Sequence, residues 1–140
     1  MIHQDEIEVS TRGRGLTDLT ARVAAVVAAS RVRAGTCSVF VRHTSASLTI
    51  QENADPAVLR DLQRWIEWVA PERPPFGAWE HDDEGPDDMP AHVRAVVTHT
   101  SEIVPIVNGK LALGTWQAIY LWEHRTAPHT RRVIVTVSGE

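Results

Sequence analysis

The sequence has one cysteine, no long apolar run and no large excess of charge of either sign. Cys37 has no partner for an internal disulfide, so we expect a reducing compartment, by default the cytoplasm. The longest strongly apolar run, Val23 to Ala29, is far shorter than the ~20 residues that a membrane-spanning helix needs. The formal net charge is -4 and the arginines are spread along the chain, so we expect no nucleic-acid partner. Residues 1–10 are acidic and mixed, whereas a secretory signal begins basic and continues apolar.

Helix-like and strand-like patterns share the rest of the chain. Helical spacing of apolar residues begins at Leu16, with Thr17 as the expected N-cap, and again at Pro56, with Asp55 as the cap. A third, short helix is expected to start near Pro90. The strand-like runs are Ile2–Val9, Cys37–Val41, Ser47–Ile50, Ile103–Val107, Trp116–Trp122 and Arg132–Val137, with a hairpin turn at Asn108-Gly109. These patterns predict one compact α+β domain over residues 1–140, mostly antiparallel sheet or sandwich, with two or three packed helices.

The segment from Pro71 to Asp88 has no periodicity and is rich in Pro, Gly, Asp and Glu. Ordered loops of this length are often functional. Trp65 and Trp68 fit the core-facing side of a helix and its rim. Trp79, in the long segment, and Trp116, beside Gly114, lie on no amphipathic face, so each is a candidate to stack on a heterocycle or a partner subunit.

His43 lies where one strand ends and a hydroxyl-rich turn, Thr44-Ser45-Ala46-Ser47, begins. Its imidazole, the hydroxyls and the backbone amides could converge there on an anion or a metal-bound water. The alternative is a strand-end histidine beside a polar turn, with no ligand.

His81, in the long segment, is a second candidate ligand. Asp82, Asp83 and Glu84 come directly after it. Asp87, Asp88 and His92 stand at the entrance of the next helix. Histidine and carboxylate are ligands suited to Zn²⁺, Mn²⁺ or similar ions. A tight zinc signature such as HExxH is absent, and a solvated acidic loop remains the alternative.

Glu123 and Arg125 close the strand that begins at Trp116. They could present a carboxylate and a guanidinium to a phosphate-bearing ligand. The alternative is edge-strand charge that discourages aggregation. The remaining histidines have no comparable neighbours and are expected to be exposed: His3, His99, His124 and His129.

Six short motifs follow one another in an order that resembles the YjbQ family, whose members are described as secondary thiamine-phosphate synthases. They are His43-Thr-Ser-Ala46, Glu52-Asn53, Asp88-Met-Pro-Ala-His92, Pro105 with Gly109, Gly114-Thr-Trp-Gln117 and Glu123-His-Arg125. The resemblance covers about Thr11 to Gly139. It implies a small α+β sandwich-like fold, commonly a homotrimer, with a site near subunit boundaries where histidines gather around a metal or oxyanion.

Carried over by position, the resemblance implies a divalent metal (Zn, Mn or Mg) on His43, His81 and His92. It implies catalytic roles for His43, Glu123 and Arg125. The residues implied to bind substrate or phosphate are Thr44, Ser45, Ser47, Asn53, Trp116 and Gln117. Gln51 departs from the family pattern, where an asparagine is expected, and this puts a direct ligand role for position 51 in doubt.

The implied reaction joins a hydroxymethylpyrimidine diphosphate to a thiazole phosphate with release of pyrophosphate. A divalent ion, Arg125 and the Thr44–Ser47 turn could neutralise the departing diphosphate. Two alternatives stay open: a metal-dependent phosphate-ester hydrolase, and a non-catalytic trimeric module whose histidines hold a metal or anion structurally. For both the synthase and the hydrolase, the ligand is a small phosphorylated molecule.

Overall fold

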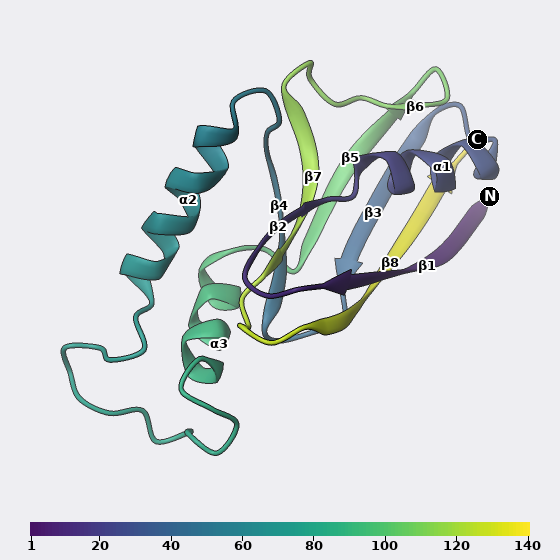
Figure 1. The fold of residues 1–140 in the computed structure, drawn as a ribbon. Coiled ribbons are helices and arrows are strands. Elements are labelled where there is room, and N and C mark those ends of the chain that lie inside the picture. Colours follow the sequence, from purple (N-terminus) through teal and green to yellow (C-terminus); the bar gives the residue numbers. More distant parts are fainter.

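The computed structural model describes residues 1–140 and contains three helices and two antiparallel sheets (Figure 1). The elements are β1 Ile2–Thr11, β2 Gly15–Asp18, α1 Thr20–Ser30, β3 Gly35–Val41, β4 Ala46–Glu52, α2 Pro56–Val69, α3 Asp88–Val97, β5 Ser101–Val107, β6 Lys110–Leu111, β7 Gln117–Glu123 and β8 His129–Gly139. The larger sheet has the strand order β1-β8-β3-β5-β6, and the smaller one β2-β7-β4. The predicted single α+β domain with mostly antiparallel strands is therefore confirmed.

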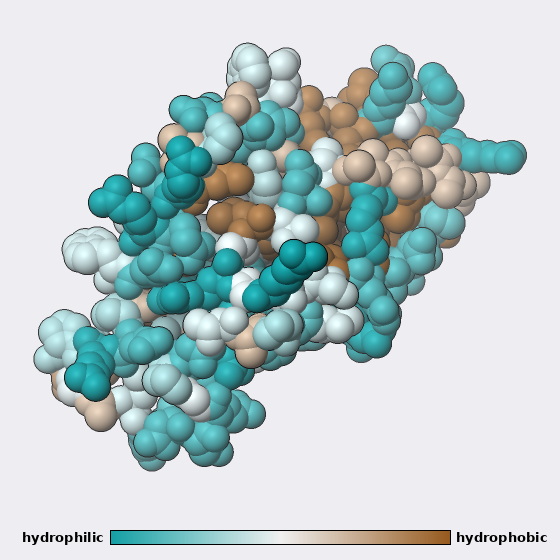
Figure 2. All heavy atoms as spheres, viewed as in Figure 1, coloured by the Kyte–Doolittle hydropathy of each residue, from teal (hydrophilic) through white to brown (hydrophobic).

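The hydrophobic core lies between the larger sheet and a layer formed by α1 and the smaller sheet. Alternation along β8 points Val133, Val135 and Val137 inward, each with no exposed surface. Val23 and Val27 of α1 join the same cluster, as do Leu48 of β4 and Leu121 of β7. In the space-filling view, hydrophobic side chains gather over α1, β5 and their neighbours, whereas the end with α3 and the Pro71–Asp87 segment is largely hydrophilic (Figure 2).

The N-terminus of α1 differs from the prediction. Residues 15–18 form β2 and pair with β7, with Thr17 opposite Leu121, so Thr17 is not the N-cap. The helix begins at Thr20, whose backbone N–H donates to Asp18 Oδ1 at 2.8 Å. A tertiary strand partner for these residues outweighed their local helical spacing.

Two other local predictions are confirmed. Asp55 caps α2, because its Oδ1 accepts from the Ala57 backbone N–H at 2.9 Å. Asn108 and Gly109, with φ of 51° and 79°, form the two-residue turn between β5 and β6.

α2 is an amphipathic helix at the edge of the molecule (Figure 1). Ile66 is its only buried residue, while Trp65 and Trp68 are 46% and 79% exposed. The expectation that these tryptophans face the core is wrong for one isolated chain. α2 therefore has only a small packing contact with the rest of the chain. The Trp122 indole N–H adds a hydrogen bond to Gln63 Oε1 at 2.9 Å.

None of the three helices combines the length and apolar character that crossing a membrane requires.

β3 and β4 are consecutive in the chain but belong to different sheets. The turn from Arg42 to Ser45 therefore crosses from the larger sheet to the smaller one. A buried ion pair lies directly beneath this crossing. Glu123 of β7 accepts from Arg131 of β8 through both carboxylate oxygens, at 2.7 and 2.5 Å, and from the Thr11 hydroxyl of β1 at 2.7 Å.

Glu123 is 1% exposed, and Arg131 also donates to the Ser45 hydroxyl at 3.0 Å. Burial alone would raise the pKa of Glu123, but the hydrogen bonds from Arg131 and Thr11 hold it below its ordinary value. The pair thus joins both sheets and the crossing turn at one end of the molecule.

Replacing Glu123 by Gln should lower the free energy of unfolding by about 3–5 kcal/mol, because Arg131 would be left buried without a counter-charge. Urea unfolding followed by circular dichroism measures the loss. Glu6→Gln, which alters an exposed pair with Arg132, serves as the control and should cost less than about 1 kcal/mol. Equal stabilities of the two variants would contradict this role of the buried pair.

Candidate metal centre

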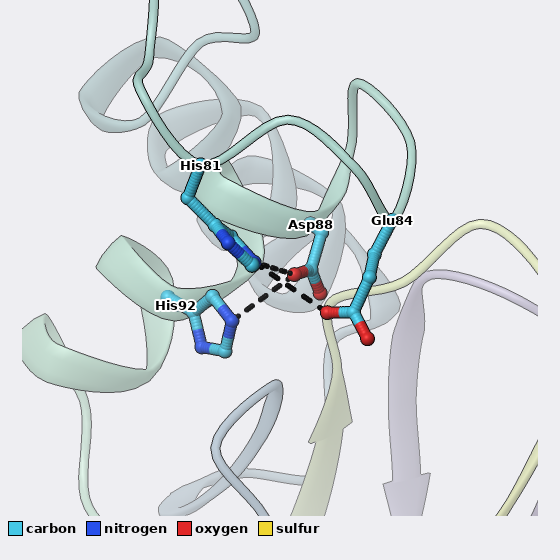
Figure 3. Close-up of side chains that lie close together, drawn as sticks. All are labelled: His81, Glu84, Asp88 and His92. Carbon is cyan, nitrogen blue, oxygen red and sulfur yellow. Dashed lines mark hydrogen bonds and ion pairs between the residues drawn. The ribbon is translucent and has the colours of Figure 1, made fainter.

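Four side chains converge where the long segment meets α3: His81, Glu84, Asp88 and His92 (Figure 3). One ligand atom from each lies within 4.8 Å of the other three. Asp88 Oδ2 is the centre of the cluster, 2.7 Å from His81 Nε2 and 3.1 Å from His92 Nε2. Glu84 Oε2 lies 3.4 Å from His81 Nε2.

Local sequence accounts for half of this arrangement. Asp88 and His92 are four residues apart in α3, so they lie on the same face of the helix one turn apart. Pro90 is compatible with the first turn of a helix, where its missing N–H costs nothing. His81 and Glu84 come from the irregular segment, and only its folded path brings them over this face.

Arg125 orients the acidic members of the cluster. Its Nη1 donates to Asp88 Oδ1 at 2.8 Å, its Nε to Asp87 Oδ2 at 3.0 Å, and its Nη2 to the Glu84 carbonyl at 2.8 Å. With Oδ1 of Asp88 held in this way, Oδ2 faces the two imidazoles. Burial alone would raise both pKa values, but hydrogen bonds from Arg125 and Thr126 keep the pKa of Asp87 at about 2. The hydrogen bond with His81 is the main contact that holds the pKa of Asp88 below its ordinary value.

The hydrogen-bond partners of the two imidazoles indicate where their ring protons lie. His92 Nδ1 lies 3.0 Å from the Thr44 carbonyl oxygen, which can only accept, so Nδ1 carries a proton. In a neutral imidazole, Nε2 would then aim its lone pair at the Asp88 carboxylate. His81 meets carboxylates on both sides, Asp83 at 3.3 Å and Asp88 at 2.7 Å, and the hydrogen bond to Asp88 raises its pKa. A metal cation between His92 Nε2 and the Asp88 carboxylate would satisfy both atoms.

The donor set fits a divalent cation. Two imidazole nitrogens and two carboxylate oxygens suit Zn²⁺ and Mn²⁺, whereas Mg²⁺ prefers an all-oxygen shell. Metal-binding histidines and carboxylates in proteins usually have their other polar atom fixed by a neighbour. His92 has such a contact to the Thr44 carbonyl, and Asp88 has one to Arg125. The cluster therefore has the donors and the supporting contacts of a metal centre.

His43 lies outside the cluster of four. Its Nε2 accepts from the backbone N–H of Arg132 at 2.8 Å, so in the neutral ring the proton is on Nδ1. Burial and the nearby Arg131 lower the pKa of His43, which favours this neutral form. His43, Thr44 and His92 line one open pocket of about 460 Å³. Of the three predicted histidine ligands, the structure brings together His81 and His92 and sets His43 in an adjoining pocket.

Several predicted phosphate-binding and catalytic side chains face the interior. The Ser45 hydroxyl accepts from Arg131, and the Ser47 hydroxyl is 2.8 Å from His124 Nε2. Ser47 has no exposed surface, and Glu123 is bound by Arg131 as described above. Thr44 is exposed, and its carbonyl fixes His92.

The other predicted substrate-binding residues lie at the far end of the smaller sheet. The β4–β7 register pairs Ala46 with Glu123 at one end and Glu52 with Gln117 at the other, which separates the ends by roughly 20 Å. Asn53 donates its backbone N–H to the Trp116 carbonyl at 3.0 Å, and the Trp116 side chain is 62% exposed. Within one chain, Asn53, Trp116 and Gln117 do not meet the cluster.

His124 was expected to be exposed, and that expectation is wrong. It has no exposed surface, and its burial, with the nearby positive charge of Arg94, lowers its pKa to about 3. The physical reason is that His124, directly after the last residue of β7, lies beside the buried Trp122 ring, 5.5 Å away, and is covered there, which a strand pattern alone does not reveal. His99 is exposed as expected, whereas His3 and His129 are half-buried.

Residues 5–140 match the profile of the family described as UPF0047 protein YjbQ-like. A UPF0047 protein of Synechocystis sp. is 54% identical over 138 residues, 99% of this chain and 92% of the relative. YjbQ of Escherichia coli O157:H7 is 39% identical over 141 aligned positions, covering 100% of both chains.

Solved structures share the fold. A crystal structure from Sulfolobus solfataricus P2, described as a YbjQ-like protein of unknown function, superposes with a TM-score of 0.90 at 28% identity, covering 100% of this chain and 99% of the other. An uncharacterized YjbQ/UPF0047 protein from Clostridium acetobutylicum gives a TM-score of 0.87 at 38% identity, covering 96% and 99%. The two-sheet architecture described above is therefore shared by these proteins.

Replacing Arg125 by Lys should weaken Zn²⁺ binding about 10–100-fold, because a single ammonium cannot hold Asp87, Asp88 and the Glu84 carbonyl together. Calorimetric titration of the metal-free protein with Zn²⁺ measures the affinity. Arg132→Lys, at an exposed arginine paired with Glu6 and Glu8, is the matched control and should bind as the wild type does. A Zn²⁺ affinity unchanged by Arg125→Lys would show that the cluster does not depend on this guanidinium.

Stability should fall on acidification because of His124. Its ordinary pKa is 6.5 and its folded value is about 3, so between these values the unfolded chain binds a proton that the folded chain does not. The free energy of unfolding should therefore decrease as the pH falls from 6.5 towards 3, by at most about 5 kcal/mol from this group. Urea titrations at several pH values should give a flatter profile for His124→Gln, while the exposed His99→Gln keeps the wild-type slope. Parallel profiles for all three proteins would refute the assignment.

Proposed function

Because the chain belongs to the UPF0047 family of YjbQ-like proteins, and because four metal-type ligands converge at the start of α3, we propose that it is a divalent-metal-dependent enzyme acting on a small phosphate-bearing substrate. The observation that carries the proposal is the cluster of His81, Glu84, Asp88 and His92, with Asp88 oriented by Arg125. A divalent ion bound there would stabilise charge on phosphoryl oxygens and lower the pKa of a bound water.

Neutral donors beside the cluster support an anionic substrate. The pocket of about 460 Å³ that reaches His92 is lined by His43, Thr44 and Thr100, which can offer hydrogen bonds to phosphate oxygens. We assign His43 to positioning such an anion. Its Nε2 already accepts from the Arg132 backbone N–H, which leaves the Nδ1–H free to donate to a phosphate oxygen.

Glu123 and Arg125 have supporting roles, because their side chains are already engaged by other groups of the protein. Glu123 uses its carboxylate on Arg131, Thr11 and two backbone N–H groups, and Arg125 uses its guanidinium on carboxylates and a carbonyl. We therefore propose that both hold the site in shape and that neither touches the substrate.

The family resemblance implies one particular reaction, the joining of a hydroxymethylpyrimidine diphosphate to a thiazole phosphate. It is compatible with a metal centre, since the departing diphosphate needs its charge neutralised. Hydrolysis of a phosphate ester requires the same neutralisation and an activated water. Assays with both kinds of substrate on the same metal-loaded protein therefore distinguish the two reactions.

The metal-loaded protein should either form thiamine phosphate from the two precursors or hydrolyse 4-nitrophenyl phosphate. Asp88→Asn and His92→Ala should each lower that rate at least about 100-fold, because each removes a ligand of the cluster. Elemental analysis should find about one Zn or Mn per chain in the wild type and less in both variants. His99→Ala, an exposed histidine outside the cluster, is the control and should keep the wild-type rate.

Stoichiometric metal without turnover of either substrate would favour a non-catalytic binding module. A folded wild-type protein that takes up no divalent metal would contradict the proposal outright.

We further propose a homotrimer in the cytoplasm. Exposed apolar side chains support self-association: Phe40, Ile103 and Val107 on the larger sheet, and Trp68 and Phe76 near the end of α2. An assembly that sets Asn53, Trp116 and Gln117 of one copy against the cluster of another would also unite the separated candidates. Cys37 is buried and unbridged, as suits a reducing compartment.

Sedimentation equilibrium at micromolar concentration should give about three times the 15.5 kDa chain mass, because these apolar side chains would then be covered. A monomer under those conditions would rule out the assembly.

A further inference from the structure

α2 and the irregular segment that follows it form an arm, residues 56–87, which extends away from the two sheets (Figure 1). Only four residues of the arm are buried: Ile66, Ala70, Pro74 and Asp87. An element with so few buried apolar side chains is only weakly held to the body of a protein by packing. The position of the arm therefore depends on individual polar contacts.

α2 is attached to the body by few such contacts. Besides the hydrogen bond from the Trp122 indole, Arg94 Nη2 donates to the carbonyl oxygen of Ala70, directly after the helix, at 2.9 Å. Glu67 adds an ion pair with Arg14 at 3.4 Å, and both side chains are partly exposed, so this pair contributes little to stability. These contacts hold the helix, but none of them reaches the segment beyond Ala70.

The segment of residues 71–83 makes a single hydrogen bond to the rest of the chain. It joins His81 Nε2 to Asp88 Oδ2 of α3, at 2.7 Å. The side chain of His81 is 41% exposed, and that of Glu84, the other ligand from the arm, is 61% exposed. Polar contacts between such exposed groups compete with water and are weak. A cation bound by both arm residues and by Asp88 and His92 would add a much stronger link between the arm and α3.

Glycines with positive φ stand on either side of the two ligands from the arm. The φ angle is +117° at Gly77 and +103° at Gly85, a range that other residues adopt only with strain. A Cβ at Gly77 would meet no atom within 4 Å, so the backbone conformation, and not packing, calls for glycine there. The stretch that carries His81 and Glu84 thus begins and ends where the chain can change direction.

A pocket beside the cluster exists only while the arm lies against α3. It has a volume of about 400 Å³, within the range of small-molecule sites. Its wall consists of arm residues between Glu72 and Pro86, His81 among them, together with Met89 of α3. Movement of the arm away from α3 would therefore remove the pocket.

We propose that the divalent metal ion controls the arm: when it binds all four ligands, it holds the arm closed on α3 and completes this pocket. Without the ion, the stretch between Gly77 and Gly85 opens away from α3. The proposal rests on the proposed function, which places a divalent ion at the cluster, and it adds regulation of the same site. Metal binding and closing of the arm are then coupled, so each favours the other by the same factor.

Chymotrypsin, which cleaves after aromatic residues, tests the closing of the arm. The bond after Trp79 lies in the arm, and the bond after Trp116, a 62% exposed residue outside the arm, is the internal reference. Zn²⁺ at about 100 times its Kd should slow cleavage after Trp79 at least about tenfold, because only the closed arm offers all four ligands. Cleavage after Trp116 should change less than about twofold, and mass spectrometry of the fragments measures both rates.

The double variant His81→Ala, Glu84→Gln removes both ligands of the arm and leaves those of α3. Zn²⁺ should then no longer slow cleavage after Trp79. Glu72→Gln, which alters an exposed carboxylate of the arm outside the cluster, is the matched control and should keep the protection seen in the wild type.

Gly77→Ala tests the coupling at a residue that is not a ligand. Alanine at a φ of +117° strains the closed arm, so Zn²⁺ should bind about tenfold more weakly in calorimetric titration. Gly15→Ala is the matched control, because Gly15 has a φ of +145°, equally open surroundings and a place in β2, outside the arm. This variant should bind Zn²⁺ as the wild type does.

Equal cleavage after Trp79 with and without Zn²⁺, or an unchanged Zn²⁺ affinity in Gly77→Ala, would overturn the proposal. If Zn²⁺ protects the arm but the loaded protein converts neither the thiamine precursors nor 4-nitrophenyl phosphate, the proposed function fails and control of the arm by the metal stands. Metal-dependent turnover with an unprotected arm gives the reverse result. A protein that binds no Zn²⁺ contradicts both.

Discussion

The buried pair of Glu123 and Arg131 is the interaction on which the rest of this structure depends. It joins a strand of the smaller sheet to a strand of the larger one, and it also binds Thr11 and the crossing turn at Ser45. Removing two charges from water is expensive, and only this complete set of hydrogen bonds makes the burial tolerable. The pair therefore specifies how the two sheets meet at one end. That end is where His43, Arg125 and α3 come together.

The candidate metal centre is an electrostatic consequence of this junction. Arg125 follows Glu123 by two residues, and the Glu123 carboxylate accepts its backbone N–H at 3.1 Å. From that position the guanidinium reaches Asp87 and Asp88 at the start of α3. One oxygen of Asp88 is thus bound by Arg125, while the other lies 2.7 and 3.1 Å from the Nε2 atoms of His81 and His92. The site combines two ligands from α3 with two supplied by the long irregular segment.

Local signals in the sequence were sufficient for most of the secondary structure. Strand alternation located β3, β5 and β8, and the Asp55 cap and the Asn108-Gly109 turn act through neighbouring backbone alone, so no distant contact could overrule them. Thr17 is different, because pairing with β7 decided its conformation. His124 and Trp68 were misjudged for a related reason: exposure depends on which element covers a face, and covering elements are distant in the chain.

At the site, the types of ligand and the helical spacing that sets Asp88 one turn from His92 follow from neighbouring residues alone. The sequence by itself also determined that the region around His81 is acidic and irregular. Only the tertiary structure decided which candidates meet. It placed Glu84 in the cluster, set His43 in the next pocket against the Arg132 backbone, and moved Asn53 and Trp116 to the opposite end of the smaller sheet. The reason is physical: spacing within a helix is a property of the local backbone, whereas proximity between loop, helix and strand ends follows from sheet register and buried charge.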